Sequence, residues 1–141
     1  MANFITTEDY NASIHQEILD AVIRSDATIV EVVEDRAIAE MRGYMSRRYD
    51  CDKIFSAEGE QRHQLVLMMA IDITIYHLFC IHNPRMMSEI RVERYERAIK
   101  WLEGIRKGDI TVDGLPEVES EVMDTASQFQ IRSNRKRNNS I

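Results

Sequence analysis

The segment DITIYHL (residues 72–78), followed by RVERYERAIKWL (residues 91–102), decides the fold of this chain. The first segment places one aspartate, Asp72, in the middle of an almost wholly apolar helix. A buried ionised carboxylate is unfavourable unless it is paired and hydrogen-bonded. The second segment offers Arg91 and Arg94, which are neighbours on a helix surface because they are three residues apart. We therefore expect an ion-pair clasp of Asp72 with Arg91 and Arg94 between two packed helices.

The helix that contains this aspartate is predicted to be the central element of the fold. It opens at Ser56 or Glu58 and runs to His82 or Asn83, where Pro84 stops it. Its apolar residues lie nearly all round the helix, so other elements must surround it.

Two helices are predicted before it. The first follows residues 4–10 and ends near residues 24–25, and the second runs from its N-cap Asp26 to about Arg48. Residues 51–59 are expected to form a loop. One face of the second helix is interpreted as a solvated charge face, made of Glu31, Glu34, Asp35 and Arg42.

The last predicted helix carries the arginines. Ser88 caps it, its last turn contains Arg106 and Lys107, and Gly108 follows as the C-terminal glycine. Four helices joined by short connections predict an all-α fold, an antiparallel bundle of about four helices.

The character of the chain changes after this bundle. We expect a helical body over residues 1–114 and an extended, weakly structured C-terminal arm over residues 115–141, because the arm has too few apolar residues to build a core. An arm of this kind can add to a neighbour's groove or sheet edge. Its expected contact residues are Phe129, Ile131, Arg132, Arg135, Lys136 and Arg137.

Charge is unevenly distributed along the chain. The net charge is −6, but the last ten residues carry four basic side chains and no acid, whereas the preceding part carries 14 basic and 24 acidic side chains. An acidic body repels nucleic acid. With no signal peptide and no apolar run long enough to span a bilayer, the expectation is a cytoplasmic protein that does not enter membranes. The two cysteines, Cys51 and Cys80, are interpreted as free thiols.

Motifs for chemistry are few. His77, Cys80 and His82 lie close in sequence, but they do not share one helix face and lack the paired spacing of zinc ligands. The sequence contains no glycine-rich phosphate loop, no nucleophile elbow and no HExxH pair. We therefore expect no catalytic residue, no metal and no cofactor.

Several segments, in this order and spacing, resemble a family of small virion proteins from Mu-like bacteriophages and prophages, associated with the head–tail junction. The resemblance covers about residues 4–116. The similar segments are residues 4–10, 44–50, 72–79, 94–102 and 108–116.

This resemblance implies a structural protein of the virion, present in the host cytoplasm before assembly. Connectors of this kind form a ring with themselves, commonly of twelve copies, between the portal protein and the tail-completion or stopper protein. DNA would pass through the channel without specific binding. The resemblance implies no catalytic residues.

Two other functions remain open. A small helical nucleic-acid-binding regulator or packaging accessory would use the basic C-terminal tail, and would bind DNA with a strong dependence on salt. An enzyme subunit or toxin-like protein would use Asp72, and would show a cleft and a perturbed titration at that residue.

Overall fold

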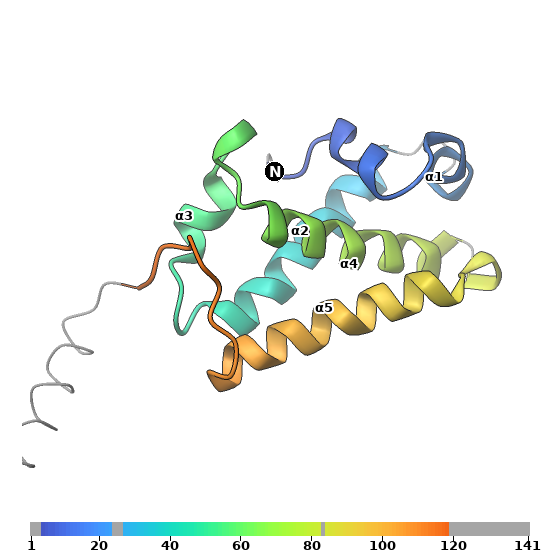
Figure 1. Cartoon of the computed structure of the whole chain (residues 1–141). Helices are drawn as coiled ribbons and strands as arrows, with labels where there is room; N and C mark the ends of the chain where they lie inside the picture. The colour runs from blue at the N-terminus through green and yellow to red at the C-terminus, as the bar shows by residue number, and fades with distance from the viewer. Residues whose placement is uncertain (1–3, 24–26, 83, 119–141) are drawn as a thin grey trace, which may run out of the picture.

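The computed structural model describes residues 4–23, 27–82 and 84–118. Three helices of 19 residues each form the bundle: α2 (Ala27–Met45), α4 (Gln64–His82) and α5 (Glu89–Lys107). Figure 1 shows α5 lying alongside α4, with the N-terminal elements at the other side of α4. No strand occurs among the described residues, so the predicted all-α bundle is confirmed.

Contacts between side chains give the relative direction of α4 and α5. His77 in α4 faces Glu40 in α2, and Tyr76 stacks on Tyr95 of α5 with ring centroids 3.9 Å apart. Four residues earlier in α4, Asp72 contacts Arg97, which is two residues later in α5 than Tyr95. Helices α4 and α5 therefore run antiparallel, as predicted.

Helix α4 is the centre of the core. It is buried on nearly every side, and α2, α5 and α1 (Gln16–Ile23) all pack against it. Its length and composition would also suit a membrane span, but 61% of the apolar window lies inside the fold, as in the core helix of a globular domain. Its buried residues are Val66, Leu67, Met69, Ala70, Ile71, Asp72, Ile73, Thr74, Ile75, Leu78 and Phe79.

The predicted loop before α4 is instead a short helix. Helix α3 spans Cys51–Ser56, and the side chain of Asp50 caps it by accepting a hydrogen bond from the backbone N–H of Lys53. A 3-10 turn, η2 (Gly59–Gln61), follows, and Gly59 adopts a φ of 60°, which favours glycine. Helix α4 therefore starts at Gln64, later than predicted.

The first predicted helix is divided into two parts. A 3-10 helix, η1 (Thr7–Ala12), is followed by α1, which starts at Gln16. The Asp9 carboxylate accepts hydrogen bonds from the backbone N–H and the hydroxyl of Thr6, which stabilises the start of η1.

The chain after α5 returns to the end of α2. Helix α5 ends at Gly108, which has a φ of 87°, as predicted for a C-terminal glycine. The backbone N–H of Asp50 donates to the Pro116 carbonyl, and that of Val118 donates to the Arg48 carbonyl. The first residues of the arm are thereby paired with the body, whereas its remainder lies outside the described residues.

Tyr49, in the core, also binds the segment that follows α5. Its buried hydroxyl oxygen accepts a hydrogen bond of 2.9 Å from the backbone N–H of Val112. We expect Tyr49→Phe to destabilise the protein by about 1–3 kcal/mol, because the N–H of Val112 would stay buried without a partner. Urea unfolding of the two chains measures this difference. An unchanged midpoint would mean that water replaces the hydroxyl.

Candidate functional site

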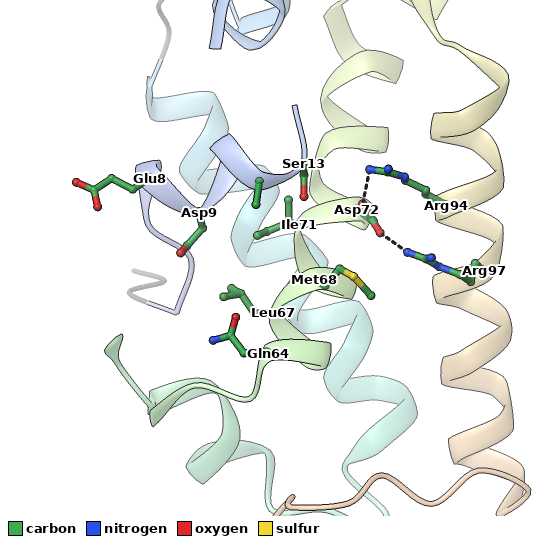
Figure 2. Close-up of a pocket in the computed structure, with 11 residues that line it drawn as sticks. Glu8, Asp9, Ser13, Gln64, Leu67, Met68, Ile71, Asp72, Arg94 and Arg97 are labelled. Atoms are coloured by element: carbon green, nitrogen blue, oxygen red, sulfur yellow. Dashed lines mark hydrogen bonds and ion pairs between the residues drawn. The ribbon is translucent and has the colours of Figure 1, made fainter. Parts of the chain in front are cut away.

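A groove of about 530 Å³ lies between η1, α4 and α5. Leu67, Met68 and Ile71 of α4 form its apolar floor, and Figure 2 shows charged side chains at its edges. Among the described residues, the groove is lined by Glu8, Asp9, Ala12, Ser13, Gln64, Leu67, Met68, Ile71, Asp72, Arg94 and Arg97.

Asp72 lies in this groove between two arginines of α5. Arg97 Nη2 donates to Asp72 Oδ2 at 2.9 Å, and Arg94 Nη1 lies 3.9 Å from Asp72 Oδ1 (Figure 2). The Asp72 side chain is 1% exposed, whereas those of Arg94 and Arg97 are 40% and 51% exposed. The aspartate is thus buried while its partners remain in contact with solvent.

The spacing of the arginines predicts that Asp72 pairs with Arg91 and Arg94, and the structure differs in one partner. Arg97 makes the direct hydrogen bond, whereas Arg91 donates through Nη2 to the Ser13 carbonyl, at the end of η1. The positive charge of Arg91 still lowers the pKa of Asp72. Arg97 also follows Arg94 at a spacing of three, so the sequence contained the signal for this partner.

Burial raises the pKa of the Asp72 carboxyl above its ordinary value, although Arg94 and Arg97 offset part of this effect. Among the described residues, Asp72 Oδ1 is one of the few buried side-chain atoms that have no hydrogen-bond partner. The carboxylate therefore has one buried acceptor position without a hydrogen bond, 3.9 Å from Arg94 Nη1.

A catalytic carboxylate would also sit in a groove with a raised pKa, so these two features do not separate an enzyme from a clasp. Catalysis by general acid and base needs a second titratable group with a free lone pair or proton. Within the described lining the other acids are Asp9, which Arg62 binds, and Glu8, which is exposed and has no described partner. The contacts of Asp72 itself are those of an ion-pair clasp, with burial as the cause of its raised pKa.

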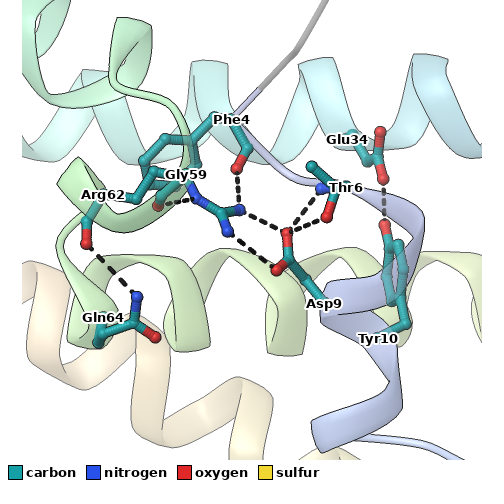
Figure 3. Close-up of polar contacts among 8 residues, drawn as sticks. All are labelled: Phe4, Thr6, Asp9, Tyr10, Glu34, Gly59, Arg62 and Gln64. Carbon is teal, nitrogen blue, oxygen red and sulfur yellow. Dashed lines mark hydrogen bonds and ion pairs between the residues drawn. The ribbon is translucent and has the colours of Figure 1, made fainter.

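Arg62 ties the N-terminal segment to the bundle and holds Asp9, which lines the groove. Its guanidinium donates to the Phe4 carbonyl at 2.7 Å, to the Gly59 carbonyl at 2.8 Å and to both carboxylate oxygens of Asp9 (Figure 3). Burial alone would raise the pKa of Asp9, but the hydrogen bonds from Arg62 and Thr6 lower it below its ordinary value. One side chain therefore joins the N-terminal segment to the η2 turn directly before α4.

A second contact holds the same N-terminal segment on α2. The buried Tyr10 hydroxyl donates to the Glu34 carboxylate, whose residue is 5% exposed (Figure 3). The interpretation of Glu34 as part of a solvated face was wrong, because η1 covers this part of α2. Burial raises the pKa of Glu34 to about 7, although the hydrogen bond from Tyr10 acts in the opposite direction.

The other chemical candidates are dispersed. His77 lies 3.3 Å from Glu40, and Cys80 is an exposed thiol. Within the described residues, no three His, Cys, Asp or Glu side chains are placed to hold one metal ion. The predicted arm contacts lie outside the described residues; these are Phe129, Ile131, Arg132, Arg135, Lys136 and Arg137.

Comparison with known proteins places these features in a family. No curated protein and no solved structure matches the chain. The family model described as bacteriophage Mu, Gp36 matches residues 4–132, which include the whole described body and part of the arm. The chain therefore belongs to the bacteriophage Mu Gp36 family.

Proposed function

We propose that this phage protein is a head–tail connector, which assembles as a ring of itself, with twelve copies expected, at the junction of portal and tail in the virion. The observation that carries the proposal is membership of the bacteriophage Mu Gp36 family over residues 4–132. In this role it contacts the portal protein above and the tail-completion or stopper protein below. It has no catalytic activity and needs no cofactor.

The architecture suits such a role. Subunits of a ring dock head-to-tail through two different surfaces, which requires a body that keeps its shape. Here the three long helices share one core, and Arg62, Glu34 and Tyr49 tie the connecting segments to it. In the assembled ring, the part of the arm beyond Val118 would reach a neighbouring subunit.

The net negative charge supports a role in which DNA passes the protein without being bound tightly. The chain without its last ten residues carries a large excess of acidic over basic side chains. A negatively charged channel wall lets DNA move without binding it tightly. The rival function, nucleic-acid binding through the basic tail, instead requires that the chain bind DNA tightly.

The ring is tested by native mass spectrometry on the full-length chain and on a chain stopped after Val118, each alone and with a portal protein of a Mu-like phage. We expect a ring of the full-length chain, and its loss or weakening on truncation. Truncation after Val118 keeps every contact of the described body, so a change in assembly would arise from the arm. A full-length chain that remains monomeric even with the portal protein would contradict the connector.

A DNA titration separates the two proposals. We expect no tight binding of duplex DNA at physiological salt. The nucleic-acid binder instead predicts binding that weakens steeply with salt and disappears when residues 132–141 are deleted. That outcome would replace the connector with the rival function.

A further inference from the structure

The groove beside Asp72 contains features of an unoccupied binding site. Its floor is apolar, and Met68 remains 38% exposed there although it belongs to the central helix. The Asp72 side chain is almost completely buried, yet its Oδ1 has no hydrogen-bond donor within the described residues. A buried acceptor beside exposed apolar surface indicates an occupant that supplies both a donor and apolar side chains.

The groove has the size of a binding site for a short segment. Its volume of about 530 Å³ lies within the range of roughly 300–1,000 Å³ that ligand pockets occupy. Glu8 at its outer edge is exposed, and no described partner pairs with its carboxylate. A basic side chain of the occupant would therefore meet a free acid on the η1 side.

We infer that, in the free chain, residues 128–132 of its own C-terminal arm occupy this groove. The sequence of this segment, QFQIR, alternates apolar and polar residues. In an extended conformation Phe129 and Ile131 face the same side and pack on the floor formed by Leu67, Met68 and Ile71. Backbone N–H groups and the carboxamide groups of the two glutamines are the donors for Asp72 Oδ1.

The basic residue at the end of the segment, Arg132, also finds a partner when Phe129 and Ile131 face the floor of the groove. Arg132 pairs with Glu8, away from Arg94 and Arg97 on the opposite side of the groove. The match to the bacteriophage Mu Gp36 family also runs to Arg132, so it includes this segment and stops before the basic cluster at residues 135–137.

The arm is long enough to reach the groove of its own chain. His63, directly before α4, has its Nε2 2.8 Å from the Asp113 carbonyl oxygen, and Val118 follows Asp113 by a stretch of at most about 17 Å. From Val118 to Phe129 the chain spans up to about 36 Å, whereas α4 rises only about 12 Å from Gln64 to Asp72. Attachment to the same molecule gives the segment a high effective concentration at the groove.

Photo-crosslinking of the full-length chain tests this inference. The photoreactive residue p-benzoylphenylalanine replaces Met68 in one chain and the exposed groove residue Gln64 in another, so the test does not depend on one substitution. The same residue in place of Ala39, which is exposed on α2, is the control. Each chain is irradiated as an equal mixture of ¹⁴N- and ¹⁵N-labelled protein, and mass spectrometry identifies the crosslinked peptides.

The expected result is a crosslink from positions 64 and 68 to residues 128–132, with both peptides carrying the same label, and none from position 39. The double variant Phe129→Ser and Ile131→Ser should reduce this crosslink at least fivefold, and neither residue belongs to the described core. Crosslinked peptides with mixed labels would place a neighbour's arm in the groove and overturn the inference. The inference would also be overturned if no crosslink to the arm formed, or if the double variant did not reduce the crosslink.

These outcomes are independent of the connector proposal. An arm docked on its own body is compatible with a ring or with a monomer. Failure of the ring therefore leaves the inference standing, and failure of the crosslink leaves the ring standing.

Discussion

The double variant Arg94→Ala and Arg97→Ala should destabilise the protein by about 3–5 kcal/mol, the range for breaking a buried ion pair from one side. Asp72 would keep its buried position between α4 and α5, but both of the arginines in contact with its carboxylate would be lost. Its pKa would rise further, and the protein would have to bury either an unpaired carboxylate or a protonated one. Urea unfolding at pH 7 measures the difference.

A double-mutant cycle identifies the cause. In a chain that carries Asp72→Asn, removal of the same two arginines should cost less than about 1 kcal/mol, because half-exposed arginines return to water easily. Lys100→Ala, on an exposed part of α5, is the matched control and should change stability by no more than about 0.5 kcal/mol. Equal losses in the native background and in the Asp72→Asn background would show that the arginines act through packing alone.

Glu34→Gln should stabilise the protein above pH 7 and have little effect near pH 4. The buried Glu34 carboxyl has a pKa of about 7 in the folded chain, against an ordinary value of 4.5. Between these two values the folded state holds a proton that the unfolded state has released, so the stability of the native chain falls as the pH rises. At about 1.4 kcal/mol for each pKa unit, the loss approaches 3 kcal/mol by pH 8.

Glutamine stays neutral and can still accept the hydrogen bond from Tyr10, so the variant should lose this pH dependence. Free energies of unfolding measured in urea from pH 4 to pH 8 test the prediction. The exposed acid Glu17, changed to glutamine, provides the control. The raised pKa of Asp72 contributes a slope of the same sign in all three chains, so the comparison isolates Glu34. If the free energies of unfolding of the native chain and of Glu34→Gln changed with pH in parallel, the prediction would be refuted.

The long helices were predictable because their signals are local. The apolar residues all round α4, the cap Ser88 and the glycine Gly108 each define an element without knowledge of the rest of the fold. Helix α3 was missed because six residues are too few to show a helical period. Its available signal was Asp50 directly before Cys51, since aspartate is a preferred N-cap.

The candidate site was predictable only in part. A lone aspartate in an apolar helix requires a partner, and arginines at helical spacing identify the element that supplies it. The choice between Arg91 and Arg97 depends on the axial register of α4 against α5, and the spacing of the arginines does not determine this register. Contacts such as those of Tyr10 with Glu34 and of Arg62 with Asp9 join residues far apart in sequence, so no local pattern predicts them.

The pairing of the chain near Val118 with the end of α2 has a mechanical consequence. A pull on the arm first loads the two backbone hydrogen bonds between Arg48, Asp50 and their partners Val118 and Pro116. Tension then passes through α2 into the packed interior, since α2 lies against both α4 and α5. The tether therefore begins at Val118 rather than at Gly108, and a load on the arm reaches the helical body through residues 48–50, between α2 and α3.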